Sequence, residues 1–303
     1  MSKSLKAAHS FSVLLCFLGI MANENGFIIV VLSREWMRCS TLPHGDMILA
    51  SLSISRFFLQ WAAVLNDFFT YFSPSDGSLY LDIFWNFTNT TTFWLTTWLA
   101  VFYCVKISSF THPIFLWLKW RISRCVPQLL LWSLLISTLI IISYFVKTYP
   151  ILQPPVTGNY SEKTTLEDMR RKLHMHFFLP LQMFILLIPF LFFLVSIILL
   201  ISSLYRHLGN MQHHSACPQD QSMQVHITTV KSFFFFLILC TSYVLPLIIT
   251  LITVYPFSVC SSRFWVWEVE TYAGISIHPA FFILNSSKLR KALKKMLHDP
   301  GAA

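Results

Sequence analysis

The chain has 303 residues, of which 55% are hydrophobic and only 12% are charged. A soluble globular domain averages about 25% charged residues, so this composition excludes an ordinary soluble protein. The net charge of +9 does not indicate a nucleic-acid-binding protein, because the basic residues are not gathered on one soluble element.

Seven apolar spans joined by short polar loops follow one another along the chain, and each is a predicted helix. We expect the helices at residues 11–32, 45–68, 83–105, 126–146, 177–203, 231–254 and 264–287. Four windows contain no Asp, Glu, Lys or Arg: Ile83–Val105, Cys125–Val146, Leu173–Tyr205 and Ser232–Ser262. Each is long enough to cross a bilayer core about 30 Å thick, which takes roughly 20 helical residues. The predicted fold is an all-α membrane protein, one domain of residues 1–303 that forms a seven-transmembrane-helix bundle in the lipid bilayer.

The distribution of Lys and Arg predicts how the bundle is oriented. The first, third and fifth loops and the tail 288–303 hold more basic residues than the N-terminal segment and the other loops. Because short cytoplasmic loops are enriched in Lys and Arg, we expect an extracellular N-terminus and a cytoplasmic tail. This orientation places the sequon Asn159-Tyr160-Ser161 outside, so Asn159 is a predicted glycosylation site.

Two ionisable residues at similar depth in the first two helices form a predicted pair. Arg56 stands near the middle of the second helix, and Glu24 stands about two turns from the inner end of the first. An ionisable group is costly at mid-membrane and usually has a partner in the bundle interior. We expect the two side chains to pair directly or through Asn25, and we favour a structural clamp over a direct ligand role.

Polar and aromatic residues near the outer ends of the third and seventh helices indicate an upper cavity. Trp85 and Asn89 are four residues apart, so they share one helix face. Glu268 and Glu270 are two residues apart and point in different directions, so at most one faces the interior squarely. Apolar walls with a few polar groups suit small amphipathic ligands. An anchor in the interfacial aromatic belt is the alternative role for Trp85.

Prolines interrupt three of the predicted helices. Pro189, Pro246 and Pro279 lie in the fifth, sixth and seventh, where each removes one intrahelical hydrogen bond and bends its helix. Such bends serve either as hinges in a bundle that changes shape or as fixed packing kinks.

The chain carries no enzyme signature. It has no nucleophile elbow, no Walker loop and no HExxH motif. Four histidines gather on a cytoplasmic loop: His207, His213, His214 and His226. No cysteine pair stands at zinc spacing beside them, so we expect no metal, no cofactor and no catalysis. A transporter would show an inverted repeat with paired broken helices, and a membrane-embedded enzyme would need a catalytic or metal constellation inside the spans.

A series of ordered motifs runs from the first helix into the tail. The motifs are Asn25-Gly26-Phe27-Ile28, Ser55-Arg56, Phe102-Tyr103-Cys104-Val105-Lys106-Ile107, the run from His112 to Ile122, Ile188-Pro189-Phe190, His278-Pro279 and Lys288-Leu289. Through these motifs the chain resembles the type 2, or bitter, taste receptor family of G protein-coupled receptors. It departs from the family pattern in a two-residue insertion, Asn23-Glu24, in Thr228 where a lysine is common, and in Asn285, which lies one position early.

The resemblance implies a function and the residues that carry it. It implies a multi-pass receptor in the plasma membrane that binds small bitter compounds and activates a gustducin-like or Gi-type G protein. The ligand-contacting positions of the family fall on Trp85, Asn89, Tyr243 and Glu268. The cytoplasmic cleft that would receive the G-protein α-subunit lies near Tyr103, Lys106, His207 and His226.

Overall fold

A computed structural model gives the structure of most of the predicted bundle. It describes residues 23–72, 77–108, 113–148, 169, 172–214, 234–235, 237–238, 241–242, 245, 279–280, 282–284 and 286–298. Most of the expected helices 231–254 and 264–287 lie outside the described residues. The predictions for Tyr243, Glu268, His226 and Asn159 fall outside them as well.

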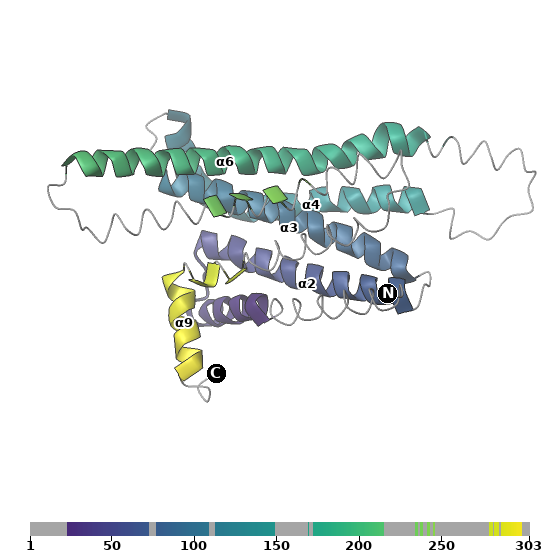
Figure 1. The fold of residues 1–303 in the computed structure, drawn as a ribbon, viewed down its shortest axis with the longest axis horizontal. Helices are drawn as coiled ribbons and strands as arrows, with labels where there is room; N and C mark the ends of the chain where they lie inside the picture. Colours follow the sequence, from purple (N-terminus) through teal and green to yellow (C-terminus); the bar gives the residue numbers. More distant parts are fainter. Residues whose placement is uncertain are drawn as a thin grey trace, which may run out of the picture.

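The described elements are long helices and one short amphipathic helix. Residues 23–39 are helical, and the elements that follow are α2 (His44–Phe72), α3 (Gly77–Ile107), α4 (Pro113–Thr148), a π-helical turn η1 (His174–Phe178), α6 (Leu179–His214) and α9 (Ser287–His298). In Figure 1 the long helices α2, α3, α4 and α6 lie alongside one another, and α9 turns across them. Three stretches in the described part of the chain are long and apolar enough to cross a membrane: His44–Leu65, Phe115–Ser143 and His176–Arg206.

The helix α4 begins at Pro113, well before the expected start at residue 126. The charged residues before position 126 kept this segment out of the predicted span, but charged side chains do not end a helix. The Arg121 guanidinium lies 5.4 Å from the ring centroid of Trp117, and Arg124 lies 4.5 Å from that of Trp120. Both pairs are four residues apart on one helix face, where cation–π contacts support the added turns.

The connection between the first described helix and α2 is only a tight turn. Ser40 has a φ of 55° and its amide donates to the carbonyl of Trp36 at 2.8 Å, which is the left-handed geometry that ends many helices. The amide of Met47 donates to the carbonyl of Pro43 at 3.0 Å as α2 begins. This turn brings the cytoplasmic ends of the two helices together.

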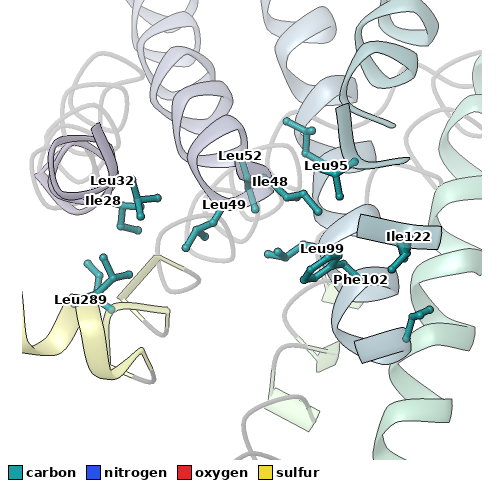
Figure 2. Packing of buried hydrophobic residues seen from close by; sticks show 13 residues of the cluster. Ile28, Leu32, Ile48, Leu49, Leu52, Leu95, Leu99, Phe102, Ile122 and Leu289 are labelled. Atoms are coloured by element: carbon teal, nitrogen blue, oxygen red, sulfur yellow. The ribbon is translucent and has the colours of Figure 1, made fainter. Parts of the chain in front are cut away.

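An apolar cluster joins five helices near the cytoplasmic end of the bundle (Figure 2). Its labelled members are Ile28, Leu32, Ile48, Leu49, Leu52, Leu95, Leu99, Phe102, Ile122 and Leu289. All of them are buried, and they come from the first described helix, α2, α3, α4 and α9. A Cβ atom on Gly45 would stand 3.1 Å from the Phe102 ring, so α2 and α3 approach closely here because Gly45 has no side chain.

The middle of α3 is buried around its whole circumference. Each residue from Thr88 to Thr97 is buried, although the stretch is rich in threonine, and α3 contacts α2, α4 and α6. Threonine hydroxyls bond back to the helix's own carbonyls: Thr92 donates to Thr88 at 2.8 Å, and Thr97 donates to Phe93 at 3.0 Å. These bonds satisfy the hydroxyls where the surrounding helices exclude water.

Hydrogen bonds between side chains connect α3 to α4. Thr91 donates to the Ser137 hydroxyl at 2.8 Å, and the indole of Trp98 donates to the Ser133 hydroxyl at 3.1 Å. Ser133 and Ser137 lie one turn apart on α4, and the Ser137 hydroxyl in turn donates to the Ser133 carbonyl at 2.8 Å. Small serine side chains let the helices approach while the hydroxyls stay satisfied.

A single hydroxyl also connects α3 to α6. Thr97 donates to the carbonyl of Pro189 at 3.0 Å, and Pro189 lies inside α6 as the sequence predicts. Ala100 on α3 packs with Phe193 and Ile197 on α6 just below this bond.

We predict that Thr91 and Ser137 are energetically coupled. Thr91→Val and Ser137→Ala each remove one side of the bond, and a double-mutant cycle on the apparent Tm of the purified receptor should give a coupling of about 0.6 kcal/mol, the average for such bonds in membranes. Thr138→Ala is the matched control, because Thr138 is exposed and its hydroxyl bonds only within its own helix. A coupling of zero for the Thr91–Ser137 pair would contradict the prediction.

Candidate functional site

The two ionisable residues predicted to pair each have a separate hydrogen bond. Nη2 of Arg56 donates to the Thr96 hydroxyl at 3.4 Å, and the Glu24 carboxylate accepts from the backbone amide of Ala280. Arg56 is buried, and Glu24 is half-buried. The Arg56 bond connects α2 to α3. The Glu24 bond connects the first described helix to Ala280, which precedes α9 in the chain. A pair between Glu24 and Arg56 stays a prediction.

The two predicted ligand residues of α3 lie in the half of the helix nearer Gly77. Trp85 is half-buried and packs against Ala63 of α2. Asn89 is only 4% exposed. Their neighbour Phe84 is 40% exposed and packs edge-to-face on Phe58 of α2, which is 49% exposed. Phe84 and Phe58 therefore meet at the exposed edge of the contact between α2 and α3. The contact of Trp85 and Asn89 with ligand stays a prediction.

The contact between α2 and α3 includes several polar residues on each helix. Arg56, Gln60 and Ala63 follow the spacing of one helix face on α2, and Arg56 and Ala63 both contact α3. On α3, the matching face carries Trp85, Asn89, Thr92 and Thr96. Near the centre of this interface, the Ser55 hydroxyl shares a 2.8 Å hydrogen bond with that of Thr92.

At the cytoplasmic end of α3 the structure describes two of the four predicted coupling residues fully. Tyr103 is half-buried and packs against the buried cluster of Cys104, Leu200 and Leu204, as do Phe115 of α4 and Ile201 of α6. Lys106 is exposed, and its Nζ lies 6.0 Å from the centroid of the Phe102 ring. His207 lies in the last turns of α6. The coupling role of these residues stays a prediction.

One lysine joins three helices at this same end. Nζ of Lys288, in the first turn of α9, lies 2.7 Å from Oδ2 of Asp46 in the first turn of α2 and pairs with the carboxylate of Glu35 in the first described helix. We call these three residues the clasp. Burial lowers the pKa of Lys288, and the two carboxylates oppose that effect by favouring the charged ammonium.

The helix α9 is held in place by a cap and by apolar packing. The Ser286 hydroxyl accepts a hydrogen bond from the Leu289 amide at 3.4 Å, which satisfies one of the free amides at the helix N-terminus. Leu289 is buried in the apolar cluster beside Ile28 and Leu32 (Figure 2). The basic residues Arg290, Lys291, Lys294 and Lys295 stay exposed.

Sequence reasoning missed the clasp. Lys288 and Asp46 are 242 positions apart, and no local pattern reports a contact at that separation.

Comparison with known proteins identifies relatives along nearly the whole chain. Residues 1–300 match the family model described as Taste receptor protein (TAS2R). Taste receptor type 2 member 134 of Rattus norvegicus is 46% identical over 290 residues, which cover 95% of this chain and 86% of that protein. Taste receptor type 2 member 41 of Mus musculus is 40% identical over 290 residues, covering 94% and 93%. Taste receptor type 2 member 62 of Pan paniscus is 42% identical over 272 residues, covering 89% and 86%.

We predict that removing the Lys288 charge destabilises the receptor. Lys288→Met leaves two half-buried carboxylates without their cation, and we expect a loss of about 1–2 kcal/mol, less than for a fully buried pair because all three groups are partly exposed. Apparent Tm and surface expression measure the effect. Lys294→Met, at an exposed position of the same helix, should change neither.

The second half of this test removes a carboxylate. Asp46→Asn in the Lys288→Met background should restore part of the lost stability, because it removes an uncompensated charge. A further loss in the double variant would mean that Lys288 and Asp46 act independently.

Proposed function

The chain belongs to the taste receptor (TAS2R) family, and from this membership we propose that small bitter compounds bind between the outer halves of its helices and activate a gustducin-like or Gi-type G protein. The observation that carries the proposal is the family match over residues 1–300. The chain is a bitter taste receptor, a seven-helix G protein-coupled receptor of the plasma membrane, and not an enzyme.

The proposed ligand site is formed by Trp85 and Asn89 of α3 with Tyr243 and Glu268. Support comes from the half of α3 that lies nearer the predicted extracellular side, where a buried amide, Asn89, stands one turn from an indole. An indole wall and a single amide suit a small amphipathic compound, because the wall supplies contact area and the amide fixes orientation. Asn159 remains the proposed glycosylation site on the same side.

The proposed mechanism is a shift between two arrangements of the helices. A bitter compound must bind the active arrangement more tightly than the resting one, since equal affinity shifts nothing. Each tenfold preference moves the equilibrium by about 1.4 kcal/mol. The active arrangement would open a cytoplasmic cleft for the G-protein α-subunit near Tyr103, Lys106, His207 and His226.

The proposed site predicts that Trp85→Ala and Asn89→Ala reduce agonist potency. Removal of one indole wall or one buried hydrogen-bonding group should cost about 1–2 kcal/mol of binding, or roughly 5-fold to 30-fold in potency. Calcium release in cells that express the chain with a promiscuous chimeric Gα measures the effect against a panel of bitter compounds.

Phe84→Ala is the matched control for this experiment. It removes an aromatic ring adjacent to Trp85 whose contact with Phe58 lies at the exposed edge between α2 and α3, so surface expression and potency should both stay near wild type. Equal loss of potency in the Phe84 and Trp85 variants would indicate a general packing effect and contradict the proposed site.

The proposed cytoplasmic cleft predicts that Lys106→Ala weakens G-protein activation without weakening agonist binding. In cells without endogenous Gα proteins, re-expression of gustducin α or a Gi α-subunit should restore signalling by the wild type, and re-expression of Gs should not. The Lys106 variant should show a reduced maximal response with gustducin, while Lys291→Ala, which removes an exposed charge from α9, keeps the full response. A Gs response as strong as that of gustducin would refute the assigned G-protein type.

A further inference from the structure

The cytoplasmic part of α4 carries two arginines stacked on two tryptophans, and all four side chains are exposed. The Arg121 guanidinium lies 5.4 Å from the ring centroid of Trp117, and that of Arg124 lies 4.5 Å from the ring centroid of Trp120. Trp117 and Trp120 are 56% and 66% exposed, and both arginines are exposed as well. These four residues share one helix face, and we call them the Trp–Arg stripe.

The same face of α4 continues as an exposed apolar surface. Its large side chains follow Arg124 at helical spacing, and all of them are exposed: Leu131, Leu135, Leu139 and Ile142. The opposite face is buried and includes Ser133 and Ser137, which both bond to side chains of α3. The Trp–Arg stripe and the apolar surface therefore both lie on the side of α4 that is turned away from α3.

The level of the Trp–Arg stripe in the membrane follows from the charges of α4. No charged residue occurs from Cys125 to Val146, and this window is long enough to cross a hydrocarbon core of about 30 Å. Arg124 therefore lies at the edge of the core on the predicted cytoplasmic side, and Arg121 lies about 4.5 Å further out along the helix. This is the level of the lipid headgroups, where tryptophan is also enriched.

The charge and geometry of the two arginines suit a phosphate. The chain has no Asp or Glu between Asp82 and Glu162, so every charged residue of α4 is basic. Stacking on an indole occupies the face of a guanidinium and leaves the N–H donors at its edge accessible. Arg121 and Arg124 are three residues apart, so their side chains start about 5–6 Å from one another. Both can therefore donate charge-assisted hydrogen bonds to the oxygens of one phosphate.

We infer that the Trp–Arg stripe binds the headgroup of an anionic phospholipid of the cytoplasmic leaflet, whose acyl chains lie along the exposed apolar surface of α4. Anionic lipids are concentrated in that leaflet, and they are attracted to basic residues next to a membrane span. Phosphatidylserine has the required net negative charge, whereas the choline cation of phosphatidylcholine cancels the charge of its phosphate. The lipid site lies on the outside of the bundle and does not depend on the proposed site for bitter compounds.

The test measures the binding of phosphatidylserine to the purified full-length receptor. Native mass spectrometry of the receptor in detergent micelles, titrated with phosphatidylserine or with phosphatidylcholine, gives the Kd of the first bound lipid. We expect the wild type to bind phosphatidylserine about 10-fold more tightly than phosphatidylcholine. A phosphatidylserine with a photoactivatable group in its acyl chain should crosslink to the α4 peptide that contains Leu131 and Leu135.

Two double variants separate a phosphate site from a diffuse attraction between surface charges. Arg121→Gln/Arg124→Gln removes both cations and should weaken phosphatidylserine binding roughly 30-fold, at about 5-fold for each arginine. Arg121→Lys/Arg124→Lys keeps both charges and removes the planar donors and their stacking, so it should still weaken binding about 5-fold.

The matched control removes two exposed charges from α9. Lys291→Gln/Lys294→Gln lowers the net charge as much as the glutamine variant of α4 does. It should change the affinity less than about 2-fold, because a detergent micelle presents single lipid molecules and salt screens charges at a distance. The apparent Tm in phosphatidylcholine verifies that each variant is folded, and the lysine variant carries the test if the glutamine variant is not.

Several outcomes would overturn this inference. Equal affinity of the wild type for the two lipids, or wild-type affinity for phosphatidylserine in the lysine variant, would mean that α4 has no phosphate site. Crosslinks confined to the α9 peptide would place the lipid on another surface. Unchanged phosphatidylserine binding together with a weaker G-protein response in the glutamine variant would assign the Trp–Arg stripe to a contact with the G protein.

Discussion

The structure depends on the need to satisfy the polar side chains of α3 inside a membrane. Each residue from Thr88 to Thr97 is buried, so none of the threonine hydroxyls in this stretch meets bulk water. They bond to carbonyls of α3, to serines of α2 and α4, and to one carbonyl of α6. In a lipid environment each polar group without a hydrogen bond raises the free energy of the folded state. The described helices α2, α4 and α6 all contact α3, which is therefore the central helix of this part of the bundle.

This central helix separates two chemically different ends. Towards Gly77 it carries the half-buried indole of Trp85 and the buried amide of Asn89. Towards Lys106 it packs against an apolar cluster and ends beside the clasp of Glu35, Asp46 and Lys288. Under the proposed function, the ligand and the G protein would meet opposite ends of the same helix, and differential packing along it would be the physical connection between them.

Much of the architecture could be predicted from the sequence, because the bilayer excludes charge and imposes a minimum helix length. Helix ends were less predictable, since a pair such as Trp117 and Arg121 supports helix beyond the predicted span. For the site, periodicity placed Trp85 and Asn89 on one face, and the structure gives the contact of Trp85 with Ala63 of α2, while the role of both residues in ligand binding stays a prediction. Contacts such as that of Lys288 with Asp46 could not be predicted, because they arise only when distant segments pack.

The bond between Thr97 and Pro189 has a mechanical consequence. Proline cannot donate an amide hydrogen, so the backbone ladder of α6 is interrupted at the level where α6 is attached to α3. The segment from Pro189 to His214 is then a lever arm about 37 Å long at 1.5 Å per residue. A rotation of about 10° at its attached end would sweep the free end through about 6 Å, so a small change of angle at the contact with α3 becomes a displacement of more than one helical turn at the far end of α6.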